Sequence, residues 1–580
     1  MLSDQTGAAR AGIARWVPGI TMLRTYHRSW LRSDLIAGIV LAAILVPQGM
    51  AYAELAGLPA VTGLYTTIAC LVGYALMGPS RILVLGPDSS VSPLIFAAIA
   101  PLAGAADPAT AIALAGMMAL LVGGIEIGLG IAKLGFVADL LSREVQIGYM
   151  NGLAITIIAG QLPKLFGFST DADGFVQEVR AFVSGLDQTN TTALLLGLAT
   201  LAVLLVLPRV SKKVPAVLVA VVGATLATAL FELSVKTVGA LPQGLPVPSL
   251  PRTSASDLVP LMAAAVGIVL VSLTDTIATS TSFAARRGDE MDPDQEMIGI
   301  GSANIAAGLF QGFAVSASGS RTAVAEQAGS KSQVTGIAGA VIVVALLVFF
   351  PSLLSDLPQT ALAAVVIAAA VSLMNLSILR TYLRVRRSAL VLSLAATLGV
   401  VLLGVLPGIG LAIVLSILLF FRRNWWPHGE VLGRVEELDG WHAVGRYPAA
   451  EQVDGVVVFR WEAPLFFANS GIFRQQIRGL VLRRRPRWIV LQCEAITDID
   501  VTAADMLRRL DLELNAQGVN IALVELRDRL QDLIVRYGLD DTLDREHVYP
   551  SVATALEAIG REAAASERGR DVEEAPAGDV

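Results

Sequence analysis

Charged side chains are scarce in this sequence. Only 16% of its 580 residues are Asp, Glu, Lys or Arg, whereas 54% are hydrophobic and the mean hydropathy is +0.65. Soluble globular proteins carry about a quarter charged residues. A chain with so little charge needs long segments in lipid, which excludes an ordinary soluble enzyme, a disulfide-stapled secreted domain and a disordered chain.

Cysteine is almost absent as well. Cys70 and Cys493 lie far apart, and neither belongs to a CxxC motif or a cluster of histidines, which argues against zinc and haem sites. No metal site is therefore certain and no cofactor is expected. The first 30 residues contain no apolar stretch long enough for a signal-peptide core. A phosphate-binding P-loop and a nucleophile constellation are also missing, so the sequence does not predict an enzyme.

The few charges are unevenly distributed. Residues 433–580 contain 18 Arg, no Lys and 26 acidic residues, whereas the first 432 residues contain 25 basic and 23 acidic residues. The first part has the composition of a membrane domain, and the second that of a soluble domain. The net charge of −6 gives no reason to expect nucleic-acid binding.

Hydrophobic runs recur from about residue 34 to residue 421. Each of the clear runs approaches the ~20 residues that a bilayer-spanning helix needs. They cover 35–55, 61–79, 109–132, 145–161, 191–208, 214–233, 258–283, 335–351, 359–379, 388–405 and 408–421. Three weaker segments, at 88–103, 296–311 and 318–330, are interrupted by Ser, Gly, Pro or charge. Counting them gives fourteen segments; a count of twelve, with two re-entrant segments, keeps the same topology.

Basic residues support this count. With a cytoplasmic N-terminus, fifteen Lys and Arg residues flank the cytoplasmic ends of the segments, and the opposite loops hold only four. Those four are Lys164, Arg180, Lys236 and Arg252. Trp425 and Trp426 follow Arg422 and Arg423 and are typical of a membrane-interface anchor. The sequence therefore predicts a multi-pass plasma-membrane protein with both termini in the cytoplasm. An acidic loop, 289–296, is expected to be a solvated turn.

Two stretches share one plan. DLIAGIVLAAILVPQGMAYAEL (34–55) and AAAVGIVLVSLTDTIATSTSFA (263–284) both carry Gly-Ile-Val-Leu and then polar residues. About forty residues after each comes an interrupted segment, LGPDSSVSPL (85–94) and AVSASGSRTAV (314–324). Paired interruptions of this kind point to the binding site of an inverted-repeat transporter. Seven segments per half give the two halves opposite orientation.

The interruptions predict two half-helices. Gly86-Pro87 prevents a continuous helix, so we expect a helix to begin at Asp88, and a second after Ser316 and Ser318. Irregular backbone at membrane depth must line protein or a water-filled cavity. Two opposed helix N-termini provide free N–H groups for an anion, and Arg321 adds a positive charge.

Several motifs together resemble the SulP anion transporters, the microbial branch of solute carrier family 26. They are LVPQGMAYAELAGLPAVTGLY (45–65), SRILVLGPDSS (80–90), GFAVSASGSRTAVAEQAGSKSQ (312–333) and a C-terminal STAS-like domain. The similarity covers about residues 16–560. It implies fourteen membrane segments in seven-plus-seven inverted repeats, core and gate domains, an elevator-like motion and a homodimer.

The resemblance also places individual residues in an anion pocket. Gln48 and Tyr52 share one helical face, and without the resemblance they read as an interhelical packing pair. The predicted substrate-binding residues are Gln48, Tyr52, Asp88, Ser89, Ser318, Gly319, Ser320 and Arg321.

Two acids are candidates for coupling transport to a second ion. Asp275 lies deep in an apolar span with Thr279 one turn on, and such residues are usually functional. The alternatives are a structural partner for Arg321 or a helix cap. In some bacterial relatives the equivalent positions bind sodium, so Asp275 and Thr279 form a possible sodium site. Asp88 departs from the family, which often has a small or apolar residue there; it is either a helix cap or a proton-coupling acid.

The chain after Pro427 predicts an α/β domain. Strands are expected at 455–461, 488–493 and 519–524, with helices near 469–485, 502–516, 527–537 and 550–562. This pattern resembles a STAS domain, the fold of anti-sigma-factor antagonists. Thr502 matches their phosphorylated hydroxyl, although it could simply cap its helix. The expected organisation is a 1–33 cytoplasmic segment, a 34–423 transporter domain, a 433–562 STAS domain and a 563–580 disordered tail.

The sequence thus predicts a secondary active transporter with a regulatory STAS domain. Sulfate is the leading substrate, and bicarbonate and C4-dicarboxylates are the runners-up. We expect coupling to protons, because an anion bound between Asp88 and Asp275 favours protonation of both by linkage; sodium coupling and exchange are the alternatives. Two further readings are an anion-sensing scaffold that signals through a STAS partner and a channel-like anion conductor.

Overall fold

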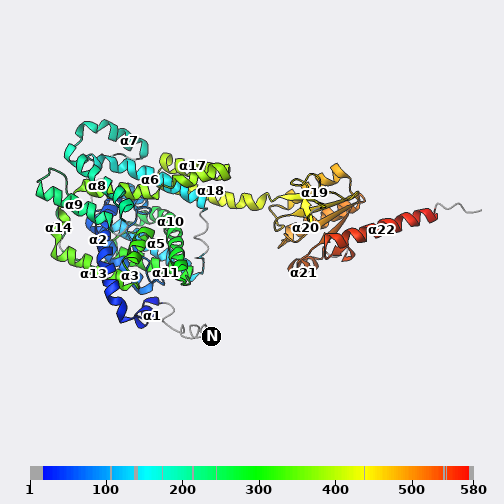
Figure 1. Ribbon diagram of the computed structural model, residues 1–580, viewed down its shortest axis with the longest axis horizontal. Coiled ribbons are helices and arrows are strands. Elements are labelled where there is room, and N and C mark those ends of the chain that lie inside the picture. Colours follow the sequence, from blue (N-terminus) through cyan, green and yellow to red (C-terminus); the bar gives the residue numbers. More distant parts are fainter. Residues whose placement is uncertain are drawn as a thin grey trace, which may run out of the picture. The chain divides into compact units, whose positions relative to one another are not determined.

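The structure is a computed structural model that describes residues 17–573, apart from 105–107, 136–141, 171, 173, 212–213, 243, 437, 540–541 and 544. The chain forms two compact units, Met1–Ile417 and Leu418–Val580 (Figure 1). The first unit is helical and the second contains a six-stranded sheet. Lys212 and Lys213, two of the basic residues counted above, lie outside the described residues.

Fourteen helices of the described chain correspond to the fourteen predicted segments. They are α2 (Leu31–Leu55), α3 (Ala60–Met77), α4 (Ser92–Ala103), α5 (Pro108–Ile131), α6 (Arg143–Leu165), α8 (Thr191–Val210), α9 (Ala216–Leu230), α10 (Ala255–Arg287), α11 (Pro293–Leu309), α12 (Gly319–Gln327), α13 (Val334–Phe349), α15 (Gln359–Leu373), α17 (Arg387–Leu403) and α18 (Val405–Trp425). Among the residues that the structure describes, seven helical stretches are long and apolar enough to cross a membrane, and five shorter apolar helices accompany them.

Four shorter helices complete this part of the chain. They are α1 (Pro18–Arg24), α7 (Phe175–Ser184), α14 (Pro351–Ser355) and α16 (Leu376–Val385). No residue of α7 or α16 is buried, so both lie on the surface of the helical unit.

The membrane helices pack in two bundles. In one bundle, α2, α3, α5, α10, α11 and α13 contact one another, and α4 and α12 pack against them; in the other, α6, α8, α9, α15 and α17 do so. Glycine permits the closest approaches: a Cβ on Gly63 of α3 would lie 1.9 Å from the carbonyl oxygen of Gly49 in α2. Small residues at such crossings bring helix backbones together in membranes.

The two interrupted segments cross each other. Strand β1 (Leu85–Gly86) pairs antiparallel with β2 (Ser316–Ala317), with Leu85 opposite Ala317 and Gly86 opposite Ser316. The half-helices α4 and α12 follow these strands. The matched strand–helix order in the two halves agrees with the inverted repeat expected from the sequence.

The second unit has helices on both faces of its sheet. The strand order is β4 (Trp441–Ala443), β3 (Gly429–Arg434), β5 (Val456–Trp461), β6 (Trp488–Gln492), β7 (Asn520–Val524) and β8 (Val548–Tyr549). The pairs β4–β3 and β3–β5 are antiparallel and the other pairs are parallel. Helices α19 (Ser470–Arg484), α20 (Val501–Asn515) and α21 (Asp528–Arg536) complete this α/β domain with α22 (Val552–Glu573).

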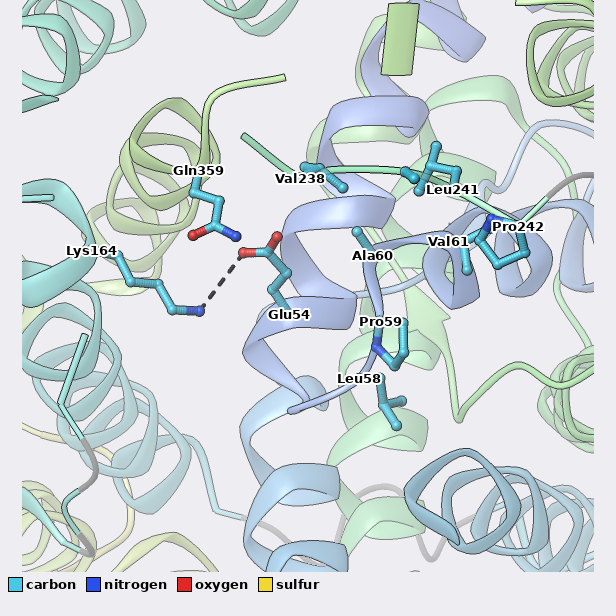
Figure 2. Close-up of a pocket in the computed structure, with 11 residues that line it drawn as sticks. Glu54, Leu58, Pro59, Ala60, Val61, Lys164, Val238, Leu241, Pro242 and Gln359 are labelled. Atoms are coloured by element: carbon cyan, nitrogen blue, oxygen red, sulfur yellow. Dashed lines mark ion pairs between the residues drawn. The ribbon is translucent and has the colours of Figure 1, made fainter. Parts of the chain in front are cut away.

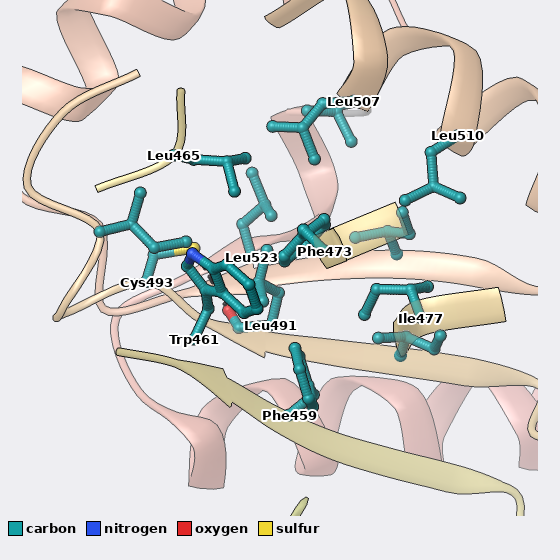
Figure 3. Close-up of a cluster of buried hydrophobic side chains, with 14 of the residues drawn as sticks. Phe459, Trp461, Leu465, Phe473, Ile477, Leu491, Cys493, Leu507, Leu510 and Leu523 are labelled. Carbon is teal, nitrogen blue, oxygen red and sulfur yellow. Dashed lines mark hydrogen bonds between the residues drawn. The ribbon is translucent and has the colours of Figure 1, made fainter. Parts of the chain in front are cut away.

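Alternating side chains build the two cores of this domain. Phe459 and Trp461 of β5 face the larger core, where Trp461 packs edge-to-face on Phe473 of α19 at 5.3 Å (Figure 3). Val458, between them in sequence, joins the smaller core with Ala555 of α22. This alternation is the period-2 pattern of a strand buried on both faces.

The segment from residue 563 onward, for which the sequence predicts disorder, overlaps the end of a helix. Helix α22 continues to Glu573, and residues 574–580 lie outside the described part. Ala, Glu and Arg, which dominate this segment, have high helix propensity, so the same composition that suggests disorder also permits an extended helix.

Candidate functional site

Backbone hydrogen bonds anchor the crossing of the interrupted segments. Thr322 of α12 accepts a hydrogen bond from the backbone N–H of Val84 at 3.1 Å, and the N–H of Ser318 donates to the Val84 carbonyl at 3.2 Å. Thr276 of α10 accepts from the N–H of Ala317 at 3.1 Å. The short sheet therefore depends on hydroxyl groups from α10 and α12 for its position.

Helix α4 begins later than the sequence suggested. It starts at Ser92, and residues 88–91 form a turn before it rather than its first turn. Oδ1 of Asp88 accepts hydrogen bonds from the backbone N–H and the hydroxyl of Ser90, at 3.0 and 2.8 Å. Aspartate commonly stabilises turns in this way. The helix begins at Ser92 rather than at Asp88 because Asp88 orders the turn before it.

Arg321 clamps the two interrupted segments together. Its side chain is 1% exposed, and its guanidinium donates to the carbonyl oxygens of Pro87 and Gly86 and to Oδ2 of Asp88. The last two distances are 3.4 Å. Gly86 makes room for this clamp, because a Cβ there would lie 3.3 Å from Nη1 of Arg321.

Asp88 is therefore the counter-ion of Arg321. This pairing changes two expectations from the sequence: Arg321 does not stand as an isolated positive charge, and its acidic partner in the described chain is Asp88 rather than Asp275. Asp88 orders the turn before α4 and pairs with Arg321; its role as a proton-coupling acid stays a prediction.

Asp275 lies on the other side of the same turn. Its Oδ1 accepts a hydrogen bond from Nε2 of Gln146 in α6 at 3.2 Å, and its carboxylate also interacts with Ser90. Thr279, one turn further along α10, lies next to the start of α12, since a Cβ on Gly319 would be 3.8 Å from its hydroxyl. Asp275 and Thr279 are thus both brought to the crossing.

Hydroxyl groups surround the two half-helix starts. Ser320 is exposed, Ser318 is half-buried, and their hydroxyl oxygens lie 3.1 Å apart. Tyr52 of α2 is buried and hydrogen-bonds Ser89 in the turn before α4. Gln48 lies one turn earlier in α2 and is half-buried. Tyr52, Ser89 and Asp88 lie together in the structure. For Gln48 the structure shows only that it lies on α2, the helix that also carries Tyr52.

Sequence reasoning missed several residues that shape this region. Gln146 and Tyr149 of α6 reach the crossing from the second bundle, and the Tyr149 hydroxyl donates to the Ser90 carbonyl at 3.2 Å. Thr276 and Thr322 hold the strands. Thr276 and Thr322 could have been noticed, because hydroxyl residues flank the charged candidates Asp275 and Arg321. Gln146 and Tyr149 could not, because a contact between α6 and α4 has no local signature in the sequence.

Two buried glutamates also escaped the sequence reading. Glu126 of α5 is fully buried and accepts hydrogen bonds from Ser272 at 3.1 Å and Asn304 at 2.8 Å. Glu296, assigned above to a solvated acidic loop, is also fully buried and accepts from Tyr74 at 2.5 Å and Ser280 at 2.9 Å. The loop assignment was wrong for Glu296 because α11 begins at Pro293 and carries it into the bundle.

A cavity of about 360 Å³ lies between the two bundles, away from the crossing (Figure 2). Glu54 of α2 and Lys164 of α6 form an ion pair of 3.7 Å on one side of it, and Gln359 of α15 lies beside them. The remaining lining is mainly apolar and comes from residues 58–61 and 238–242. The Glu54–Lys164 ion pair therefore links α2 of one bundle to α6 of the other.

In the second unit, Thr502 is exposed in the first turn of α20. It is not the residue that caps the helix: Oδ1 of Asp500 accepts from the N–H of Ala503 at 2.8 Å, and Oδ2 accepts from that of Phe467 at 2.8 Å. The Thr502 hydroxyl is thus left accessible. Within the described residues, no group of three His, Cys, Asp or Glu side chains could hold a metal ion.

The fold and the crossing define a multi-pass membrane transporter built from inverted repeats, with a C-terminal STAS domain. The sequence matches the model of the "Sulfate permease family" over residues 31–396 and that of the "STAS domain" over residues 447–555. The chain belongs to the sulfate permease family, which is a family of transporters rather than enzymes.

Similar proteins come from distant organisms. A protein described as "Probable sulfate transporter" from Mycobacterium tuberculosis is 40% identical, over 94% of this chain and 99% of its own length. "Sulfate transporter 4.1, chloroplastic" from Arabidopsis thaliana is 29% identical over 94% of this chain and 84% of its own. Human "Solute carrier family 26 member 6" is 31% identical over 81% of this chain and 65% of its own.

Solved structures share the fold. Murine solute carrier 26 family member A9 has a TM-score of 0.85 at 24% identity, covering 96% of both chains. The transmembrane domain of a cyanobacterium bicarbonate transporter, BicA, has a TM-score of 0.60 at 23% identity and covers 68% of this chain and 98% of its own.

Proposed function

We propose that this protein is a secondary active transporter of small anions with sulfate as its substrate, and that it carries protons together with the anion. Relatives named as sulfate transporters match almost the whole chain, which supports the choice of sulfate. We also propose that it lies in the plasma membrane with both termini and the STAS domain in the cytoplasm, as the basic residues predict, and that it forms a homodimer, as the family resemblance implies.

One observation carries the proposal: two half-helices begin beside each other at an antiparallel strand pair, with buried serines at the start of α4 and the exposed Ser320 at the start of α12. The first N–H groups of a helix have no partner within it, so those at Gly319 and Ser320 are free to donate to an anion. The positive ends of both helix dipoles favour the same ligand. Ser89, Ser318 and Tyr52 add hydroxyl donors.

The charges at the site favour cotransport with protons. Because Asp88 neutralises Arg321, a bound sulfate brings two negative charges to a site that already holds Asp275. Repulsion between these charges is relieved when the carboxylates bind protons, and proton binding then favours the anion by linkage. Fewer net charges also lower the cost of crossing the low-dielectric barrier.

The division into two bundles suits alternating access of the elevator type. The half-helices belong to the bundle of α2, α3, α5, α10, α11 and α13, whereas Gln146 and Tyr149 reach them from the other bundle. Movement of one bundle along the other would carry the anion and expose it on the opposite side. The Glu54–Lys164 pair would have to break during such a movement.

Bicarbonate is the second candidate substrate, because BicA shares the fold of the membrane domain. In that version, Asp275 and Thr279 would hold a sodium ion, for which a carboxylate and a neighbouring hydroxyl supply oxygen ligands. Exchange, a C4-dicarboxylate substrate, a channel-like pore and an anion-sensing scaffold are the other outcomes. Regulation through phosphorylation of Thr502 or through a STAS partner is compatible with all of them.

The coupling ion can be tested with purified protein in proteoliposomes, with a pH gradient and a sodium gradient imposed separately. Sulfate uptake should follow the pH gradient, and Asp275→Asn should abolish most of this response. The matched control is Asp289→Asn, which removes an exposed carboxylate after α10. Uptake that requires sodium and ignores the pH gradient would reject proton coupling in favour of the sodium version.

A further inference from the structure

Helix α16 is a basic amphipathic helix on the surface of the helical unit. Met374, which has extended backbone, and Asn375, which is not helical, separate it from α15, and extended Arg386 separates it from α17. No residue of α16 is buried. A short helix interrupted on both sides in this way can take a direction of its own, independent of the spans that it connects.

The exposed side of α16 combines leucine with arginine. Leu376 and Leu383, two turns apart on one face, are 55% and 58% exposed. Arg380 and Arg384, one turn apart, lie beside this apolar face and are exposed as well. Arg386 and Arg387 follow directly. This is the pattern of a helix that lies in the plane of a membrane interface, with leucine toward the acyl chains and arginine toward the headgroups.

The stretch of sequence that contains α16 carries charge of a single sign. No Asp or Glu occurs from residue 357 to residue 429, so the helix and its flanking spans carry only arginine. Glu144, at the start of α6, approaches Tyr382 together with Arg143 and is the acid that faces this helix. Such a surface is complementary to an anionic one.

The order of the spans also favours a place at the membrane surface. Helix α16 connects α15 to α17, two helices that the sequence predicts as consecutive membrane spans. Arg380, Arg384, Arg386 and Arg387 match the excess of basic residues expected at the cytoplasmic surface. We therefore expect the arginines of α16 at the level of the phospholipid phosphates.

We propose that α16 binds the headgroups of anionic phospholipids, with Arg380 and Arg384 as the phosphate ligands. Arginine suits this role because its planar guanidinium donates two parallel hydrogen bonds to a phosphate. The proposal is independent of the transported anion, because the crossing of the half-helices contains no residue of α16.

Helix α7 provides a matched comparison within the same chain. It follows the far end of α6, on the opposite side of the spans, and also exposes apolar residues, among them Val176 and Val183. Its single arginine, Arg180, is accompanied by Glu178. If arginine substitutions in α7 and in α16 weakened lipid binding equally, general amphipathicity rather than the arginine cluster would be what attracts lipid.

The test uses full-length protein purified in a neutral detergent and phosphatidylglycerol as the probe. Native mass spectrometry counts the lipids retained, and melting temperatures are recorded with phosphatidylglycerol, with phosphatidylcholine and with soluble glycerol 3-phosphate. The variants are Arg380→Gln/Arg384→Gln, its conservative counterpart Arg380→Lys/Arg384→Lys, and Arg180→Gln as the control.

We expect wild type to retain phosphatidylglycerol over phosphatidylcholine and to be stabilised by it. The glutamine double variant should bind phosphatidylglycerol about thirtyfold more weakly, the lysine variant should keep part of the binding, and Arg180→Gln should match wild type. Wild-type phosphatidylglycerol binding in the glutamine variant overturns the proposal. Equal stabilisation by glycerol 3-phosphate also overturns it, since the ligand would then be a soluble phosphate. The proposal is also overturned if the glutamine variant is destabilised as much in phosphatidylcholine as in phosphatidylglycerol, because the arginines would then stabilise the fold through contacts with protein.

Discussion

Removing Arg321 and removing Asp88 should destabilise the protein to different extents. Arg321→Gln leaves the carbonyl oxygens of Gly86 and Pro87 without their donor and leaves the Asp88 carboxylate, which is 13% exposed, without its counter-ion. Breaking a buried ion pair by removing one partner costs about 3–5 kcal/mol. Because Arg321 also holds β1 to α12, we expect a loss at the upper end of this range.

Asp88→Asn should cost less. The asparagine oxygen can still accept the two hydrogen bonds from Ser90, and Arg321 keeps both carbonyl acceptors. The hydrogen bond from Arg321 is lost, because the amide nitrogen then faces the guanidinium, and the buried Arg321 charge loses its counter-ion. We therefore expect a loss of about 3 kcal/mol, at the lower end of that range. In the double variant the losses should not add, with a coupling of about 1–3 kcal/mol between the two sites.

The assay is the melting temperature of the purified protein in detergent, measured for wild type, both single variants and the double variant, with and without sulfate. The expected order of stability is wild type, then Asp88→Asn, then Arg321→Gln, with the double variant close to Arg321→Gln. Additive losses, or an Arg321→Gln protein as stable as wild type, would refute the assignment of Arg321 as the clamp between the two segments.

Three further predictions follow from packing and burial. Gly63→Ala should abolish the accumulation of folded protein, because its Cβ would lie 1.9 Å from the Gly49 carbonyl oxygen, whereas Gly124→Ala, in open space on α5, should accumulate normally on a size-exclusion profile. Cys493 should resist maleimide at pH 8, because burial raises the pKa of its thiol to about 12 and only about one thiol in 10⁴ is then ionised. Peptide mapping should detect labelling of Cys493 only after unfolding. In Glu54→Cys/Lys164→Cys, a bifunctional methanethiosulfonate reagent that bridges the two thiols should link the two bundles and block uptake until it is reduced, because the wild-type side chains meet with their charged atoms 3.7 Å apart. Full uptake by the cross-linked protein would contradict relative movement of the bundles.

The membrane spans could be predicted from sequence because lipid imposes a simple rule. A helix in lipid must be long and apolar, so hydropathy located all fourteen segments, including the interrupted ones at 88–103 and 318–330. Glycine, proline and serine marked the interruptions. The alternation in 456–461 likewise predicted a strand, since both faces of β5 are buried.

The partners within the site could not be predicted in the same way. Arg321 and Asp88 are 233 positions apart, and their pairing depends on the antiparallel register of two-residue strands, which carry too little sequence to specify it. Glu296 looked exposed because its neighbours in sequence are acidic, although helix geometry turns it toward Tyr74. In each case the deciding contact came from another part of the chain.

Uptake of radiolabelled sulfate into proteoliposomes tests the central claim most directly. Wild-type protein should accumulate sulfate in a saturable manner when the lumen is more alkaline than the medium, and unlabelled sulfate should compete. Ser320→Ala should raise the concentration for half-maximal uptake, because it removes a donor at the start of α12. No uptake beyond empty liposomes, for sulfate or any other small anion and under every imposed gradient, would contradict the account.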